Sequence, residues 1–221
     1  MFFKKYIGAG LLSVLATASG AQEFVGGTLG LEYTSFDGAD ATSYTGEVEF
    51  AINRQFGVEL DWNGASSDGE TASRATLHGI YHMSNTSSVG AFYGQSVGGD
   101  VDSSFYGIEG GTLVGTFSVG AYLGRQDIDG TDATTFGLNA EVPIYNAFEL
   151  YYDTDLAVVD DVWAGTSELG VQYNMSNGPE IFAHFGSVTA TDGITTASED
   201  YVGIGARINF GAKRGTTFEG R

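Results

Sequence analysis

Apolar and polar side chains alternate along most of the chain after residue 22. The segment FGVELDW at 56–62 places an apolar residue at every second position, with glycine or an acid between them. The segments 117–123, 136–142 and 202–210 repeat this arrangement. A period of two predicts β-strands whose two faces meet different environments.

Two interleaved series of turn signals separate these segments. The first series lies in polar stretches such as 64–72 and 190–200, which we expect to form the longer loops. Its aspartates are Asp37, Asp68, Asp100, Asp129, Asp160 and Asp192. The second series reads as tight turns near Asn53, Asn85, Gly115, Asn146 and Asn177. The even spacing predicts twelve strands in six hairpins; ten follow instead if two weak hairpins around 84–115 merge.

The apolar face of these strands has the features of a lipid-facing surface. The expected strands are about 9–11 residues long, the length that crosses a bilayer at a tilt. Aromatic residues gather at both ends of this face, as in the two interfacial belts of membrane barrels. The belt near the tight turns comprises Phe50, Phe56, Tyr81, Phe117, Phe148, Tyr173 and Phe210. The belt near the longer loops comprises Tyr33, Tyr44, Trp62, Tyr106 and Phe136.

Only helices and closed barrels satisfy the backbone polar groups in lipid. After residue 22 the apolar runs are too short for a spanning helix. The expected fold class is therefore all-β: a closed antiparallel transmembrane β-barrel of about 12 strands, connected as an up-and-down meander. The alternative is a soluble β-sandwich that buries Leu31, Val48 and Leu138 in its core.

The first 21 residues have the three parts of a secretory signal peptide. Lys4 and Lys5 precede a short apolar run, and Ser19-Gly20-Ala21 supplies small residues before Gln22. We expect residues 1–21 to be removed on export. The barrel then spans 22–210, and 211–221 forms a short periplasmic tail.

Composition narrows the range of functions. The chain has 28 acids and 9 bases, a formal charge of −19, and so lacks the basic surface that binds nucleic-acid phosphates. It has no cysteine and only 3 histidines, so we expect neither a metal site nor a cofactor. The sequence contains no phosphate-binding loop and no recognisable catalytic triad.

The export signal, the even number of alternating strands and the closing segment 201–210 together resemble porin-type outer-membrane β-barrel proteins of Gram-negative bacteria. The resemblance is one of architecture. It implies a location in the cell outer membrane, contact with outer-membrane lipid and lipopolysaccharide, and insertion by the barrel-assembly machinery. That machinery recognises a closing strand with a terminal aromatic residue, whereas here Phe210 is followed by 211–221.

The face opposite the apolar one carries the strand carboxylates and many glycines. Because small residues leave room, we expect a narrow water-filled lumen. Carboxylates around a lumen favour cations, so the hypothesis is a non-enzymatic channel for passive diffusion of small hydrophilic solutes, with a preference for cations. The residues predicted to line it are Glu32, Glu47, Glu49, Glu59, Asp61, Arg74, His78, Glu109, Glu141, Glu149, Asp153, Glu168 and Arg207. In the alternative, these groups pair with one another in a non-conducting structural barrel.

Two short motifs point to other chemistry. His82-Met83-Ser84-Asn85 resembles the His-x-Ser-Asn stretch of some outer-membrane lipid hydrolases, including phospholipase A and lipid A deacylase, in which a histidine activates a serine. Three aspartates in 127–132 loosely resemble a Ca²⁺ loop, although an Asp-Gly pair is more typical of a hairpin turn.

Overall fold

The computed structural model describes residues 23–99, 101–175 and 179–211, so the expected signal peptide and nearly all of the expected tail lie outside the described residues. Its strands are β1 (Glu23–Phe36), β2 (Asp40–Ala51), β3 (Phe56–Ser67), β4 (Glu70–His82), β5 (Ser87–Gly98), β6 (Val101–Val114), β7 (Phe117–Ile128), β8 (Thr131–Tyr145), β9 (Phe148–Val159), β10 (Val162–Asn174), β11 (Glu180–Thr191) and β12 (Thr196–Gly211). No helix in these ranges is long and apolar enough to cross a membrane.

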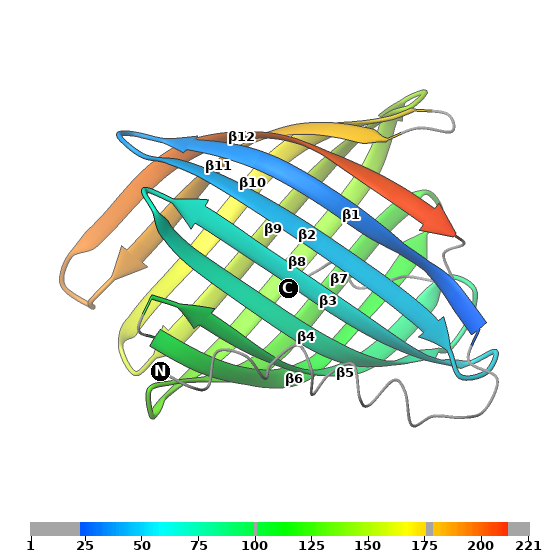
Figure 1. Ribbon diagram of the computed structural model, residues 1–221, viewed down its shortest axis with the longest axis horizontal. Coiled ribbons are helices and arrows are strands. Elements are labelled where there is room, and N and C mark those ends of the chain that lie inside the picture. Colours follow the sequence, from blue (N-terminus) through cyan, green and yellow to red (C-terminus); the bar gives the residue numbers. More distant parts are fainter. Residues whose placement is uncertain (1–22, 100, 176–178, 212–221) are drawn as a thin grey trace.

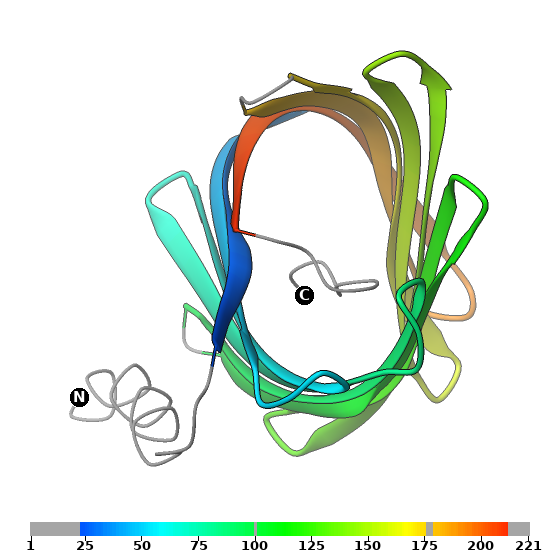
Figure 2. The same cartoon turned by 90° about the vertical axis from the view of Figure 1, so that its right-hand side faces the viewer.

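The twelve strands form a closed barrel in which each strand pairs with its neighbours in sequence, and β1 pairs with β12 (Figures 1 and 2). This confirms the expected up-and-down meander. The ten-strand alternative is wrong, because β5 and β6 form a full antiparallel pair within the region where two hairpins could have merged. Since the number of strands is even, β1 begins and β12 ends at the same end of the barrel.

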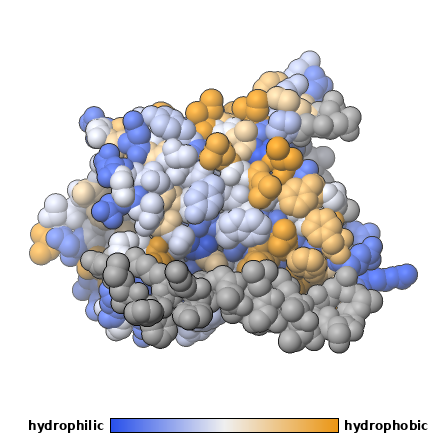
Figure 3. All heavy atoms as spheres, in the orientation of Figure 1, coloured by the Kyte–Doolittle hydropathy of each residue, from blue (hydrophilic) through white to orange (hydrophobic). Residues whose placement is uncertain are grey.

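The alternation of the sequence separates the outer and inner faces of the wall. Large apolar residues on the outer face are exposed: Leu31 is 60% exposed and Ile108 64%. Aromatic rings pair across this face near the tight turns, with centroids 5.0 Å apart for Phe56 and Tyr81. Apolar residues gather toward the end where β1 begins, while the opposite end is more hydrophilic (Figure 3). The soluble-sandwich alternative, which would bury Leu31, is therefore wrong.

Two local details refine the expected faces. A β-bulge lies between Phe24 and Gly26 in the pairing of β1 with β2. As a result Val25, which has the same parity as Leu29 and Leu31, is buried, and Phe24 lies between the rings of Phe50 and Phe210. In β11 the apolar residues Ile181 and Phe182 are adjacent, and therefore have opposite directions; Ile181 is exposed on the outer face and Phe182 is buried.

The strands are longer than the expected 9–11 residues, at 12 to 16. The additional residues lie at the end opposite the tight turns, where polar residues such as Ser35 and Thr134 continue the outer face beyond Tyr33 and Phe136. Polar residues can remain in paired strands when both faces meet water. The expectation of a long loop over 64–72 is wrong for this reason, because Asp68 and Gly69 alone form the turn between β3 and β4.

Aspartates organise the hairpin tips at this end. Asp127 accepts a hydrogen bond from the Gly130 amide at 3.0 Å, and Gly130 has φ of +85°, so the hairpin interpretation of 127–132 is confirmed. At 192–195, the Thr195 and Ile194 amides donate to Asp192 Oδ1 at 2.6 and 2.9 Å. These bonds lower the pKa of the Asp192 carboxyl below its usual value, because they stabilise the charged form.

The closing register provides a test of the fold. Leu31 on β1 is opposite Ala206 on β12, and the chain has no cysteine of its own. Directly opposed residues of antiparallel strands have Cα atoms about 4.5–5.5 Å apart, within the range that a disulfide bridges. We expect the variant Leu31→Cys/Ala206→Cys to cross-link on oxidation of the folded protein, detected as a mobility change on non-reducing gels.

Leu31→Cys/Ile208→Cys is the control for that register. Ile208 lies on the same outer face of β12 but opposite Leu29, so its diagonal separation from Leu31 is too long for a disulfide and this pair should remain reduced under the same conditions. Cross-linking of the control in preference to the matched pair would contradict the register.

Candidate functional site: the barrel interior

The residues predicted to line a pore all lie on the inner face of the wall, but they do not form a single site. Glu59, Asp61, His78 and Glu109 form one buried cluster. Glu32, Glu47, Asp153, Glu168 and Arg207 border a central cavity, and Arg74 borders a second cavity. Glu49 bonds His82, and Glu149 bonds Gln172. Glu141 is opposite the inward Tyr151.

The central cavity has a volume of about 260 Å³ and an acidic wall. Five carboxylates border it, against one arginine and one histidine. They are Glu32, Glu47, Asp153, Asp155 and Glu168, with Arg207 and His184. Two of these carboxylates lie on β1 and β2 and the other three on β9 and β10, so the negative charge comes from two separate parts of the wall.

A second cavity of about 430 Å³ lies toward the aspartate-rich hairpin tips. Its wall includes Arg74, whose guanidinium lies 3.7 Å from the centroid of the Phe105 ring. Both cavities are bordered by Tyr122, Asp155 and Thr166, so the two spaces adjoin. The Tyr122 hydroxyl donates to Asp155 Oδ1 at 2.5 Å, which holds both side chains at this junction.

The sequence suggested that inward glycines leave open space, but seven of them are covered by side-chain rings. Each of these seven lies under a ring from the residue directly opposite it on a neighbouring strand, and a Cβ atom at the glycine would overlap that ring. The pairs are Gly94 with Phe105, Gly107 with Phe92, Gly137 with Tyr122, Gly170 with Tyr151, Gly186 with Tyr201, Gly203 with His184 and Gly205 with Phe182. A ring over a glycine stays close to the wall, and the cavity remains beside it.

Hydrogen bonds link the inner face of the strands near the tight turns. Gln172 Nε2 donates to Glu149 at 2.7 Å, and Arg207 Nη2 donates to the Gln172 oxygen at 3.4 Å. Arg207 Nε also lies 3.3 Å from Glu180, which accepts a hydrogen bond from Asn209 at 2.5 Å. This network joins β9, β10, β11 and β12 on the side of the central cavity that is nearer the tight turns.

The His-x-Ser-Asn motif does not form the pair expected of a lipid hydrolase. Ser84 lies in the exposed turn and bonds Thr86 at 3.2 Å. His82 Nδ1 instead bonds Ser88 at 2.9 Å, and its Nε2 bonds Glu49 at 3.1 Å. Ser88, His82 and Glu49 thus form a serine–histidine–acid group that the sequence did not indicate. Ser88 is completely buried, however, and a nucleophile needs access to its substrate.

Several interior residues escaped sequence-based prediction. Asp155 continues the parity of Asp153 on β9, so a longer reading of the same alternation would have found it. Phe92 shares its parity with Gly90 and Gly94, which also marks it as inward. The glycine–ring pairs carry no such signal, because they depend on the register between strands.

No protein-family model matches this sequence, and no curated protein matches it either. Among solved structures, the KdgM porin in complex with disordered oligogalacturonate superposes with a TM-score of 0.64 at 10% identity, over 83% of this chain and 99% of that chain. The NanC porin gives 0.64 at 11% identity, over 81% and 98%. An outer membrane channel from Pseudomonas putida F1 gives 0.61 at 8% identity, over 88% and 98%. The chain therefore shares the fold of these channels.

The glycine–ring contacts can be tested by adding one methyl group. Tyr151 bonds His184 at 3.0 Å and lies over Gly170, so Gly170→Ala forces the ring away from the wall. Overpacking of this kind costs about 1–3 kcal/mol. We expect urea unfolding of the refolded protein to give this loss for Gly170→Ala.

Gly79→Ala is the matched control. The nearest atom to a Cβ at Gly79 is 3.9 Å away, so the added methyl group meets no obstacle. We expect its free energy of unfolding to remain within about 0.5 kcal/mol of the parent. Equal stability of the two variants would contradict the described contacts.

Proposed function

We propose that the protein is an outer-membrane porin that allows passive diffusion of small hydrophilic solutes and prefers cations. The observation that carries this proposal is the central cavity inside a closed barrel, bordered by five carboxylates and one arginine. A water-filled space of this kind provides a polar path, and its charge selects the sign of the permeating solute.

The outer surface supports the membrane location. Apolar side chains such as Leu29 and Ile204 are about half exposed on the outer face of their strands. In water this exposure would be unfavourable, at roughly 25 cal/mol per Å² of apolar surface. In a bilayer, the same side chains contact hydrocarbon, and closure satisfies the backbone groups. Outer-membrane lipid, lipopolysaccharide and the barrel-assembly machinery are the partners that this location implies.

The negative charge of the interior makes the proposed channel unsuited to acidic sugars. The solved KdgM complex contains oligogalacturonate, a chain of sugar acids. In this chain the central cavity has Arg207 as its single arginine, among five carboxylates. Anions entering such a cavity are repelled at short range. We therefore infer that cations and neutral solutes permeate, and that acidic oligosaccharides do not.

Two other functions remain as outcomes of the tests. A non-conducting structural barrel is favoured by the Glu149–Gln172–Arg207–Glu180 network, which ties the wall together beneath the cavity. A lipid hydrolase is disfavoured, because Ser84 does not contact His82 and Ser88 is inaccessible. We infer that the protein is not an enzyme.

Conductance in a planar bilayer tests the channel and its selectivity together. In a salt gradient, the reversal potential of the refolded protein should have the sign expected for cation preference. Removing two cavity charges with Asp153→Asn/Glu168→Gln should move the reversal potential toward zero, because the fixed negative charge decreases.

Asp160→Asn is the control for this measurement. Asp160 lies in an exposed two-residue turn with φ of +51°, a conformation that asparagine also adopts. This variant should keep the parent reversal potential. Anion preference of the parent protein would overturn the proposed selectivity, and absence of conductance would favour the structural barrel.

The membrane contact is tested by a charge on the outer face. Leu29 lies midway along the apolar part of β1, and Leu29→Arg should destabilise the barrel in lipid vesicles by about 2–4 kcal/mol. Ser35 lies on the same face beyond Tyr33, so Ser35→Arg should cost roughly 0–1 kcal/mol. Equal losses in urea unfolding would contradict the position of the bilayer.

A further inference from the structure

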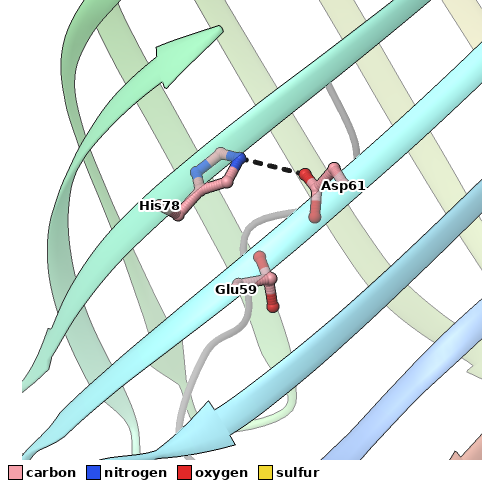
Figure 4. Close-up of side chains that lie close together, drawn as sticks. All are labelled: Glu59, Asp61 and His78. Atoms are coloured by element: carbon pink, nitrogen blue, oxygen red, sulfur yellow. Dashed lines mark ion pairs between the residues drawn. The ribbon is translucent and has the colours of Figure 1, made fainter. Parts of the chain in front are cut away.

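Three potential metal ligands meet inside the wall formed by β3 and β4. Glu59 and Asp61 are two residues apart on β3 and share its inner face, and His78 on β4 is directly opposite Glu59. One ligand atom from each lies within 4.8 Å of the others. The three side chains are 2%, 1% and 0% exposed. In Figure 4 they extend from the two neighbouring strands toward a common space.

Two atoms in this group lack the hydrogen bonds that buried polar atoms normally have. Among the residues that the structure describes, nothing donates to Glu59 Oε1 or forms a hydrogen bond with His78 Nε2. His78 Nε2 lies 3.0 Å from Asp61 Oδ2, close enough for an ion pair but without hydrogen-bond geometry. Buried polar atoms without a partner are rare in folded proteins, and a bound ion is one established reason for them.

A fourth residue orients the histidine. Glu109, on β6, lies 2.7 Å from His78 Nδ1. It reaches across β5 above Gly90, where a Cβ atom would be 2.8 Å from Glu109 Oε1. When Nδ1 donates to this carboxylate, the Nε2 lone pair is directed to the side of Asp61. A carboxylate behind the imidazole is the usual outer partner of a metal-binding histidine.

The charge of the cluster also favours a cation. Three carboxylates, those of Glu59, Asp61 and Glu109, surround one imidazole in a site closed to solvent. On β2, Glu49 lies directly opposite Glu59 and Glu47 directly opposite Asp61, so two more carboxylates flank the cluster. Buried like charges are strongly unfavourable unless protons or a cation compensate them.

We propose that Glu59, Asp61 and His78 bind one divalent transition-metal ion, with Zn²⁺ as the best match, and that Glu109 positions His78 as its ligand. Zn²⁺ binds imidazole nitrogen and carboxylate oxygen at about 2.0–2.2 Å, which places tetrahedral donors about 3.4 Å apart. The His78–Asp61 separation of 3.0 Å is close to that value. Glu59 completes the set by rotation of its side chain, and water supplies a fourth ligand.

The donor set distinguishes this ion from the hard cations. Ca²⁺ takes six to eight oxygen ligands and Mg²⁺ keeps several waters, whereas this site offers one nitrogen and two carboxylates from three side chains. Since all three ligands are buried, the ion serves to join β3 to β4 and to neutralise the carboxylates. The site does not depend on conduction through the cavity, so it stands or falls separately from the proposed channel.

Metal content and calorimetry test the site on the full refolded chain in detergent. After treatment with EDTA, the protein is titrated with Zn²⁺ and then desalted for metal analysis. We expect one tightly held Zn²⁺ per chain. Glu59→Gln and His78→Asn should each weaken binding by roughly 100-fold or more, and Glu109→Gln by roughly 10–100-fold, as found for outer partners of metal ligands. Co²⁺ in place of Zn²⁺ should give the visible bands of a tetrahedral site.

Asp153→Asn is the matched control, because it also removes one inward carboxylate but lies at the central cavity. It should keep the parent affinity for Zn²⁺. Heat-modifiable gel migration identifies the folded fraction of each variant. If the folded parent protein retains no stoichiometric Zn²⁺, the proposal is overturned whatever the variants do. Equal Zn²⁺ affinity of Glu59→Gln and Asp153→Asn would also overturn the proposal, because the ion would then be held by the overall negative charge of the interior and not by this cluster.

Discussion

The pairing of β1 with β12 is the interaction on which the rest of the structure depends. An open sheet of this length would expose two rows of unpaired amides and carbonyls, which lipid cannot satisfy. The closing pair runs in register from Gly26 with Gly211 to Phe36 with Tyr201. Once it forms, every strand has two neighbours, and the alternation along each strand becomes a difference between outside and inside. Closure of the barrel by β1 and β12 therefore places the apolar side chains outside and the acidic side chains inside.

The interior is shaped by complementary sizes across neighbouring strands. At seven inward glycines, the residue directly opposite on a neighbouring strand carries a ring that lies over the glycine, as Tyr151 does over Gly170. This arrangement lets bulky side chains line a barrel without filling its centre. It also gives tyrosines a place to bond interior acids, since Tyr201 donates to Glu168 at 2.7 Å. Charge and ring therefore stabilise each other along the cavity wall.

Much of this architecture follows from short-range sequence signals. Alternation through residues such as Val58 and Leu60 identifies strands, and Asp-Gly pairs such as 129–130 mark their ends. These signals also place Glu59 and His78 on the inner face, since parity is a local property. Contacts between strands are different. That Glu109 reaches His78 across Gly90, or that His82 bonds Ser88 and not Ser84, depends on register and on side-chain length, which no single segment encodes.

The same limit explains the expected loop at 64–72. Its composition is that of a loop, but polar residues stay in a hairpin when solvent lies on both sides. The resulting hairpin tips are short, which limits how the entrance at this end of the barrel can be narrowed. Many barrels narrow their entrance with a long segment folded back into the mouth, and among the described tips at this end the longest, 192–195, has no length to do so. Among the described residues, side chains of the wall are therefore what can narrow the entrance at this end, so differences in its width should evolve by point substitution and not by loop exchange.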